Sequence, residues 1–429
     1  IIPERGGIVS EWRCKGREVV YFDQERYANP ANSIRGGIPV LFPICGNLPG
    51  DLLQVDGQDH TLQQHGFARN LPWQLQVLDD QQGVRVSLSS TEDTLKAYPF
   101  AFEVAMDVRP TPGALEITTI FKPANLVPAS AWALTEIISR QEALPPGTFN
   151  LVMGSGGSVG NTIINSDKIH AVSFTGSLPV GREVAKATAA NLVKCQLEMG
   201  SKNALIVAAD ADLDVAVNAA FVGAYSGTGQ KCTASSRLIV DQSVHDEFVA
   251  KLIAKLENVT VGHALEDGVD MGPVASEQQL NENLNWVSVG QQEGATLAFG
   301  GGRIAAATDG YFMAPALFVD TTNDMRINRE ELFAPIACVI KATDYEDALQ
   351  ILNDTEFGLT AGIITQSLKI ASDFKRRAVS GCVMVNLPTA GTDYHVPFGG
   401  RKNSSFGPRE QGQSAREFYT TVKTSYIQA

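Results

Sequence analysis

The sequence predicts an all-β segment followed by a larger α/β segment with a parallel sheet. Residues 1–121 contain short alternating apolar runs, such as Val84, Val86 and Leu88, separated by turns rich in Gly, Pro and Asn. From residue 122 the pattern changes: residues 130–143 are typical of an amphipathic helix, and residues 148–153 and 168–176 are typical of strands. Helices that alternate with strands at this spacing predict βαβ units, with helices on the faces of a parallel sheet.

The composition is that of an ordinary globular protein. The 429 residues are enough for two or three domains, and 44% of them are hydrophobic. A formal charge of −13 without runs of Lys or Arg argues against nucleic acid as a partner. The sequence has no apolar stretch long enough for a membrane span and no signal sequence, so we expect a cytoplasmic protein without membrane contact.

The cysteines point to a nucleophile rather than to a structural site. Six are scattered along the chain, at positions 14, 45, 195, 232, 338 and 382. They form no CxxC pair and show no ligand spacing, which argues against a disulfide framework and against a metal site. We therefore expect no bound metal, and a functional cysteine is expected to act alone.

The sequence at each end of the chain leads to one structural expectation. The chain starts at Ile1 with a sequence that has the pattern of the middle of a strand, so we expect a further segment upstream. Near the other end, residues 417–427 alternate well enough to predict an edge strand. Such a strand could extend the sheet of a second subunit, which would make the protein a homo-oligomer.

Two reactive side chains stand out beside glycines. Glu198 follows an apolar run in LEMGSK, at the predicted exit of a strand, where apolar surroundings would raise its pKa toward that of a general base. A surface carboxylate at a strand end explains the same segment equally well. Cys232 lies in GQKC, between a Gly-containing turn and a β-branched run. Its position fits a nucleophile, but it also fits a small buried apolar residue.

Several segments occur together in an order that is typical of one enzyme family. They are FKPA at 121–124, SFTGS at 173–177, LEMGSK at 197–202, GQKC at 229–232, REELFAP at 329–335 and PFGGRK at 397–402. With this set, the chain from residue 122 onward resembles the NAD(P)+-dependent aldehyde dehydrogenases. The resemblance implies a truncated NAD(P)-binding domain at 122–200, a catalytic α/β domain at 201–405 and a tail at 406–429 with an oligomerisation strand.

The resemblance also implies the chemistry of the two reactive side chains. Cys232 corresponds to the nucleophile that attacks the aldehyde carbon. Glu198 corresponds to the base that activates water to hydrolyse the resulting thioester. An aldehyde is therefore the expected substrate, with NAD or NADP as the cofactor that accepts the hydride.

Further residues correspond to the family's cofactor contacts. Lys122 matches the lysine that binds the adenosine ribose, and Gly176 and Ser177 match the helix start that receives the pyrophosphate. Glu331 and Phe333 match the pair beside the nicotinamide ribose and ring. The glycine-rich run at 154–160 lacks the spacing of the usual dinucleotide fingerprint, and we interpret it as a loop that enters a helix on the cofactor side.

The choice of cofactor and substrate rests on a few positions. Many NAD-preferring relatives carry a Glu three residues after the cofactor lysine, where this chain has Asn125. Without that negative charge NADP+ is admissible, so we expect dual use or a preference for NADP+. The segment at 386–412 is similar to the branch that oxidises 2,5-dioxopentanoate to 2-oxoglutarate. His395, Arg401 and Arg409 could bind an anionic substrate there, although structural roles explain them equally well.

Residues 1–121 resemble another family. The segments at 3–23, 33–51 and 64–73 are similar to the amino-terminal part of hexose-6-phosphate mutarotases and aldose 1-epimerase-like proteins, which are sugar-binding β-sandwiches. The match implies that Arg35 and Arg69 face a sugar or its phosphate and that His65 is an active-site histidine. The second histidine and the catalytic glutamate of that family lie beyond the matching part, so we expect no epimerase activity.

The two resemblances meet at residues 121 and 122 without a linker. The aldehyde dehydrogenase family has a segment before the cofactor lysine that this chain replaces, including an Asn that donates to the oxyanion. We therefore expect impaired dehydrogenase activity. A join inside both domains favours a chimera over a selected bifunctional enzyme. Three hypotheses follow: an aldehyde dehydrogenase, a sugar-phosphate binding module and a non-functional hybrid.

Overall fold

The structure of the protein is a computed structural model that divides into two compact units. It describes the chain up to residue 422, except residues 15, 16, 19, 30, 31, 45–47, 56, 79–82, 109–118, 142, 143 and 146. One unit consists of Ile1–Ile120 and Ala133–Asn150, and the other of Phe121–Trp132 and Leu151–Ala429. Leu115 and Ile117, which continue the alternating apolar pattern of the all-β segment, lie outside the described residues, and β8 (Thr119–Phe121) follows them.

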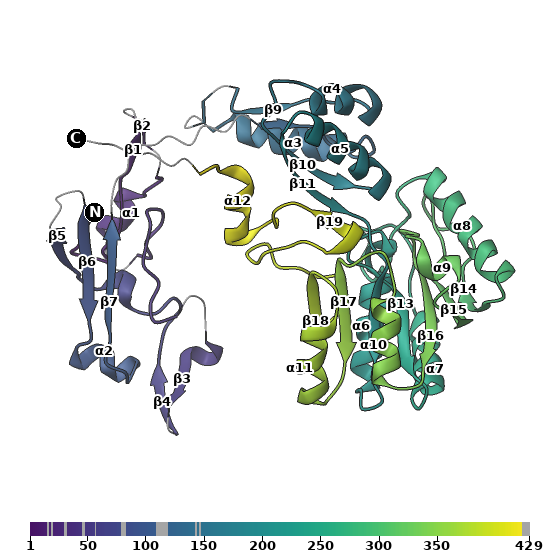
Figure 1. Cartoon of the computed structure of the whole chain (residues 1–429). Helices are drawn as coiled ribbons and strands as arrows, with labels where there is room; N and C mark the ends of the chain where they lie inside the picture. Colours follow the sequence, from purple (N-terminus) through teal and green to yellow (C-terminus); the bar gives the residue numbers. More distant parts are fainter. Residues whose placement is uncertain are drawn as a thin grey trace. The chain divides into compact units, whose positions relative to one another are not determined.

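The first unit is built mainly from short antiparallel strands (Figure 1). Its largest sheet has the order β5–β6–β7, and β3 pairs with β4 and β1 with β2. The bounds are β1 (Arg13–Cys14), β2 (Arg17–Glu18), α1 (Gln24–Ala28), η1 (Pro49–Asp51), β3 (Leu52–Val55), β4 (Gln58–Thr61), η2 (Ala68–Asn70), β5 (Gln74–Val77), β6 (Val84–Ser89), α2 (Glu92–Ala97) and β7 (Glu103–Val108). The predicted all-β character of this segment is confirmed.

One face of the β5–β6–β7 sheet is apolar. Val86 and Leu88 of β6 are buried against Trp73, as their alternation with polar residues predicts. The Trp73 indole satisfies its own polar group, since its Nε1–H donates to the Ala68 carbonyl at 2.9 Å. Phe42 and Phe102 pack on each other beside this core, with ring centroids 4.8 Å apart.

The chain then enters the predicted pattern of alternating helices and strands. The predicted helix is α3 (Pro128–Ser139), and the predicted strands are β9 (Phe149–Leu151), paired with β8, and β10 (Ala171–Gly176). The glycine-rich run forms a single π-helical turn, η3 (Gly156–Gly160), that leads into α4 (Asn161–Ile164). Strand β10 continues through α5 (Leu178–Ala190) into the parallel strand β11 (Lys194–Met199), which completes a βαβ unit.

The core of the second unit is a seven-stranded sheet in the order β14–β15–β16–β13–β12–β17–β18. Its strand pairs are parallel except for β14 with β15. The strands are β12 (Asn203–Val207), β13 (Ser235–Asp241), β14 (Thr296–Gly300), β15 (Ala316–Thr321), β16 (Ile336–Ala342), β17 (Thr360–Ile364) and β18 (Cys382–Val385). The predicted α/β fold with a parallel sheet is thereby confirmed.

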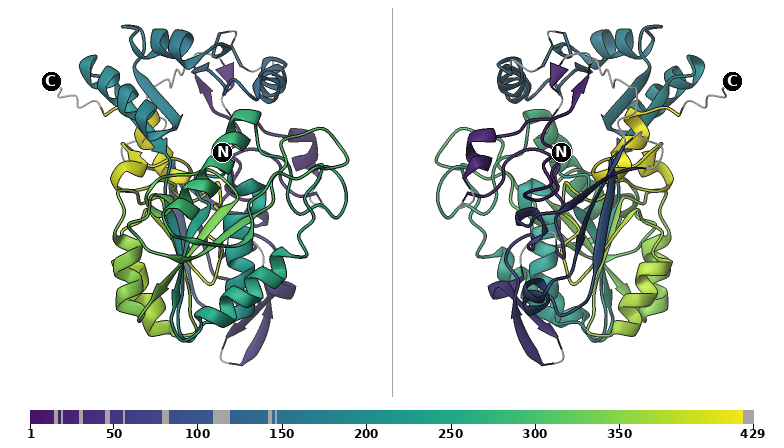
Figure 2. Two further views of the ribbon diagram at one scale, coloured as in Figure 1. Left: turned by 90° about the vertical axis from the view of Figure 1, so that its right-hand side faces the viewer. Right: turned by 90° about the vertical axis from the view of Figure 1, so that its left-hand side faces the viewer.

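Helices cover both faces of this sheet (Figures 1 and 2). Along β12, Leu205 and Val207 pack against one pair of helices, whereas Ala204 and Ile206 pack against the other pair. The strand is therefore apolar throughout, as expected where both faces are buried. The first pair is α6 (Leu213–Ala224) and α7 (His245–Leu256), and the second is α10 (Tyr345–Asn353) and α11 (Leu368–Arg377). Two further helices, α8 (Glu277–Gln292) and α9 (Arg326–Arg329), pack in one apolar cluster with β15.

In the carboxy-terminal segment, the structure differs from the predicted edge strand. After η5 (Lys402–Ser404), the short strand β19 (Ser405–Phe406) pairs with β11, and η6 (Gly412–Ser414) leads into α12 (Ala415–Tyr419). The strand predicted at 417–427 is therefore wrong for its first residues, and residues 423–429 lie outside the described part of the chain. The Lys194 ammonium group donates to the carbonyls of Glu417 and Thr420 and so satisfies the end of the helix.

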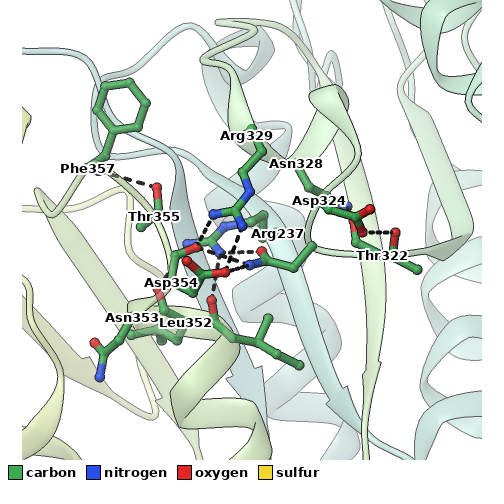
Figure 3. A network of polar contacts seen from close by, with 12 residues as sticks. Arg237, Thr322, Asp324, Asn328, Arg329, Leu352, Asn353, Asp354, Thr355 and Phe357 are labelled. Carbon is green, nitrogen blue, oxygen red and sulfur yellow. Dashed lines mark hydrogen bonds and ion pairs between the residues drawn. The ribbon is translucent and has the colours of Figure 1, made fainter.

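A buried arginine ties β13 to neighbouring segments (Figure 3). Arg237 is 1% exposed, and its guanidinium group donates to the carbonyl of Lys202 through Nε and Nη2, at 3.2 and 3.0 Å. It also donates to the Asn323 side chain and to the carbonyls at the end of α10. Burial lowers the pKa of Arg237 to about 10, so it stays charged at neutral pH.

None of the helices in the described part of the chain is long and apolar enough to span a membrane.

The Arg237 contacts predict a large loss of stability when the side chain is removed. We expect Arg237→Met to lower the free energy of unfolding by about 3 kcal/mol, because buried carbonyl groups lose their donors. Urea denaturation followed by circular dichroism measures this change. Arg377→Ala is the matched control, since Arg377 forms exposed ion pairs with Glu346 and Asp373 that water screens. Equal losses of unfolding free energy in Arg237→Met and Arg377→Ala would contradict a stabilising role for the buried Arg237 contacts.

Candidate active site

Glu198 lies near the end of β11, where it is only 4% exposed. The strand is flanked by β10 on one side and by β19 on the other, and the β19 register places Ser405 opposite Glu198. The Ser405 hydroxyl donates to Glu198 Oε2 at 2.5 Å. Burial raises the pKa of Glu198 to about 7, although the Ser405 hydrogen bond opposes the shift. A carboxyl group with this pKa can accept a proton near neutral pH.

Cys232 follows the tight turn η4 (Ser226–Gly229) and precedes β13. The turn requires glycine at position 229, which has φ +63°; a Cβ there would lie 2.1 Å from the Ala334 carbonyl oxygen. The approach brings the GQKC segment against the segment that contains Glu331. Two distant motifs of the sequence thus meet at one place.

Asn203 fixes the backbone of the Cys232 loop. Its buried side-chain amide donates to the carbonyls of Cys232 and Ala234, at 2.8 and 3.0 Å, and accepts from the Thr360 N–H at 2.9 Å. The Thr389 hydroxyl adds a hydrogen bond to the Thr233 carbonyl at 2.8 Å. The loop that carries the thiol is therefore held from two neighbouring strands and from the segment after β18.

The surroundings of the Cys232 thiol favour its protonated form. Burial raises the thiol pKa, and the carboxylates of Glu331 and Glu198 raise it further. The backbone N–H groups of Cys232 and Thr233 act in the opposite direction. The site therefore combines a half-buried thiol with two nearby carboxyl groups, one of which can take up a proton at neutral pH.

Glu331 is tied to the turn that follows Glu198. Its Oε1 accepts from the Ser201 N–H at 3.0 Å, and a Cβ on Gly200 would lie 1.7 Å from its Oε2. Glycine at position 200 thus permits the close approach of the carboxylate. Phe333, two residues further on, is 39% exposed and adopts a left-handed backbone conformation, φ 52°. The structure brings Glu198, Cys232 and Glu331 together.

The remaining predicted cofactor residues lie on the segments around β8, β10 and α5. The Lys122 ammonium group donates to the Pro123 carbonyl at 2.7 Å and to the Asn125 side chain at 3.4 Å. Gly176 ends β10, and the exposed Ser177 is the N-cap of α5, without a capping hydrogen bond from its own side chain. The N–H groups of the first turn of α5 that lack a cap are suited to an anion.

The predicted sugar-binding residues belong to the first unit. Arg35 is exposed, and its carbonyl accepts from the Asp23 N–H. His65 is half-buried with a left-handed backbone, φ 66°, and Arg69 donates to the Gln64 carbonyl at 3.1 Å. His65 lies in a turn and Arg69 in the following short helix η2, and the contact with Gln64 brings the Arg69 side chain to the residue beside His65.

The cationic side chains proposed to bind an anionic substrate differ in their exposure and in their distance from Glu198. His395 and Arg401 are exposed. Arg409 lies close to Glu198 and helps to lower its pKa. Across the described residues, no group of three or more His, Cys, Asp or Glu side chains could hold a metal ion.

The sequence did not single out Asn203 or Ser405. Asn203 starts β12, in which every residue is buried, and a buried amide in such a strand is a signal of a specific hydrogen bond. Ser405 carries no comparable signal, because its importance arises from a strand pairing between residues 207 positions apart. Both residues contact the predicted catalytic residues or their backbone.

Comparison with known proteins identifies the family. The model of the aldehyde dehydrogenase family matches residues 97–425, and the aldose 1-epimerase model matches residues 1–123. The chain belongs to the aldehyde dehydrogenase family, a class of NAD(P)-dependent oxidoreductases. Its amino-terminal segment is similar to aldose 1-epimerases, as the sequence predicts.

Two individual members of the family are similar to most of this chain. The chain is 40% identical to alpha-ketoglutaric semialdehyde dehydrogenase of Bacillus subtilis over 335 residues, which cover 77% of the chain and 68% of the relative. It is 41% identical to 2,5-dioxopentanoate dehydrogenase of Saccharolobus solfataricus over 312 residues, or 72% of the chain and 64% of the relative. The chain thus spans about two thirds of the length of these relatives.

A solved aldehyde dehydrogenase shares the fold and was determined with its cofactor. This NAD+ complex from Bacillus cereus matches with a TM-score of 0.69 and 30% identity, over 83% of this chain and 72% of that chain. The start of α5, which lacks a side-chain cap, is a place in the second unit that suits an anionic phosphate group. NAD or NADP is accordingly the cofactor of this family member.

The charges around Cys232 predict how its reactivity depends on pH. Because the Glu331 carboxylate raises the thiol pKa, Glu331→Gln should lower that pKa and shift alkylation of Cys232 toward lower pH. The rate of iodoacetamide modification, followed by mass spectrometry of the Cys232 peptide, measures the shift. Glu330→Gln is the control, since this exposed neighbour pairs with Arg326. An unchanged profile in Glu331→Gln would refute the electrostatic explanation.

Proposed function

We propose that the chain oxidises an aldehyde to a carboxylic acid with NAD(P)+, and that the substrate is 2,5-dioxopentanoate, which gives 2-oxoglutarate. The observation that carries the proposal is the convergence of Cys232, Glu198 and Glu331 on one half-buried site. The relatives named for this substrate, at about 40% identity, support the choice of aldehyde.

In this proposal Cys232 is the nucleophile. After the thiol has released its proton to solvent water, Sγ bonds to the aldehyde carbon, and the carbonyl electron pair moves to oxygen. The backbone N–H of Cys232 is suited to stabilise that oxygen, and Asn203 keeps this part of the backbone in place. The bound cofactor supplies a hydride acceptor, so that a thioester on Sγ results.

Glu198 then acts as the general base. It takes a proton from a water molecule that attacks the thioester carbon, and the bond between that carbon and Sγ then breaks, which releases the acid and leaves Cys232 as the thiolate. A pKa of about 7 suits this role, because the carboxylate is half ionised at neutral pH and is basic enough to accept a proton. Burial away from water supplies that basicity.

We assign the remaining predicted residues to the cofactor and the substrate. Lys122 and Asn125 would contact the adenosine ribose, and Gly176 and Ser177 the pyrophosphate at the start of α5. Glu331 and Phe333 would hold the nicotinamide ribose and ring. His395, Arg401 and Arg409 are candidate partners for the substrate carboxylate. A cytoplasmic location and assembly as a homo-oligomer belong to the same proposal.

The epimerase match favours a second function for the first unit, namely binding of a sugar or a sugar phosphate. Arg35, His65 and Arg69 would face that ligand. Arg69 donates to the carbonyl of Gln64, the residue before His65, which supports a shared role for these two.

The dehydrogenase proposal predicts an aldehyde-dependent rise in NAD(P)H absorbance with 2,5-dioxopentanoate. Cys232→Ser should abolish it, because the hydroxyl is a far weaker nucleophile. Glu198→Gln should slow turnover by about a hundredfold or more, since it removes the general base. Circular dichroism establishes that each variant is folded. A flat trace from the folded wild-type chain would instead favour the non-functional hybrid.

The Asn125 position predicts the choice between the two cofactors. The wild-type chain should use NADP+ at least as well as NAD+. Asn125→Glu should reduce kcat/KM for NADP+ relative to NAD+ by about tenfold, because a carboxylate repels the 2′-phosphate. Asn125→Gln keeps the position neutral and should leave the ratio unchanged. A strong NAD+ preference of the wild-type chain would overturn this prediction.

A further inference from the structure

The Glu198 carboxylate is held by a side chain on another strand. The Ser405 hydroxyl lies 2.5 Å from Glu198 Oε2, a distance typical of a hydrogen bond from a hydroxyl to a carboxylate. The same Ser405 oxygen accepts from the Gly400 N–H at 2.5 Å. An ionised carboxylate can only accept a hydrogen bond, so the Ser405 hydroxyl donates its one proton to Glu198 while its oxygen accepts from the Gly400 N–H. The direction of the hydrogen bond is thereby fixed.

Two glycines make the approach possible. A Cβ on Gly400 would lie 2.8 Å from the Ser405 Oγ, and a Cβ on Gly399 would lie 2.7 Å from Glu198 Oε1. The pairing of β11 with β19 sets Glu198 and Ser405 opposite each other. The consecutive glycines and the strand register therefore serve the same contact.

We propose that Ser405 is the positioning residue of Glu198: with its hydroxyl fixed by Gly400, it holds the carboxylate in its ionised form and in one orientation for thioester hydrolysis. This inference rests on the proposed function of Glu198 as the general base. It assigns to the β19 strand a part in the reaction beyond completing a sheet.

Other charged groups also face Glu198 and set the background for a test. Glu410 raises the pKa of Glu198, whereas Arg409 and the Gly400 N–H lower it. Cys232 lies within electrostatic reach, since Glu198 raises the pKa of its thiol. Among the groups that oppose the effect of burial, the Ser405 hydrogen bond is the strongest. Its removal should therefore raise the pKa of Glu198 while the other groups stay in place.

The first test measures the Glu198 carboxyl group directly. Titration of protein labelled with carboxyl-¹³C glutamate, with the Glu198 resonance assigned through Glu198→Gln, gives its pKa by NMR. Ser405→Ala should raise this pKa by about one unit, the effect of losing one hydrogen bond to a charged group. Ser405→Thr keeps a hydroxyl and should restore the wild-type value.

Ser404→Ala is the matched control. Ser404 is the buried neighbour, and its hydroxyl donates to the Gly200 carbonyl and accepts from the Gly358 N–H. Its removal costs stability without removing a donor to Glu198, so the Glu198 pKa should stay in place. An unmoved pKa in Ser405→Ala, or an equal shift in Ser404→Ala, would overturn the proposal.

The second test follows hydrolysis without any cofactor. A nitrophenyl ester transfers its acyl group to the Cys232 thiolate and releases nitrophenolate in a burst, after which water and Glu198 release the acid. Ser405→Ala should keep the burst, lower the steady rate about fivefold at pH 7 and move the acidic limb of the pH profile upward by about one unit. Ser405→Thr should behave as the wild type.

The two tests distinguish a failure of the Ser405 proposal from a failure of the proposed dehydrogenase function. Absence of a burst in the wild-type chain would overturn Cys232 as the nucleophile and with it the proposed function, whereas the titration alone decides whether Ser405 controls Glu198. A burst with an unchanged acidic limb in Ser405→Ala would overturn the role of Ser405 and leave the proposed function intact.

Discussion

The site depends on the short turn between β11 and β12, which anchors three distant segments through its backbone. The Gly200 carbonyl accepts from Ser404, the Ser201 N–H donates to Glu331, and the Lys202 carbonyl accepts from the buried Arg237. Each contact satisfies a backbone group that burial would otherwise leave unpaired. The turn thus connects the sheet that carries Glu198 to the large sheet that carries the Cys232 loop.

Burial of the site also sets the reactivity of Glu198 and Cys232. A carboxylate loses solvation when it is buried, so the position that makes Glu198 a base near neutral pH also disfavours its charge. The hydrogen bond from Ser405 of β19 offsets part of that cost. The thiol of Cys232 has a raised pKa for the same reason, and its loop is held by Asn203 rather than by apolar packing alone. Burial therefore raises both pKa values, and the neighbouring hydrogen bonds and charges adjust them.

The chain combines segments of two families, and residues 97–123 match both family models. The amino-terminal part has its own apolar core around Trp73, and the dehydrogenase part has its core in the seven-stranded sheet. All parts of the proposed thiol chemistry lie in the second unit, on β11, β19 and the segments beside β12 and β13. The predicted domain bounds at 121, 200 and 405 stay predictions.

The sequence by itself determined the α/β class, the helix and strands between residues 128 and 176, and the motifs around Glu198 and Cys232, because periodicity and short motifs are local. The strand predicted at 417–427 was wrong for its first residues, which belong to α12, and the carbonyls at the end of that helix accept hydrogen bonds from Lys194. Only the tertiary structure decided that Asn203 holds the Cys232 loop and that Ser405 faces Glu198. These contacts join residues 29 and 207 positions apart, and no local pattern encodes a register set by packing between distant strands.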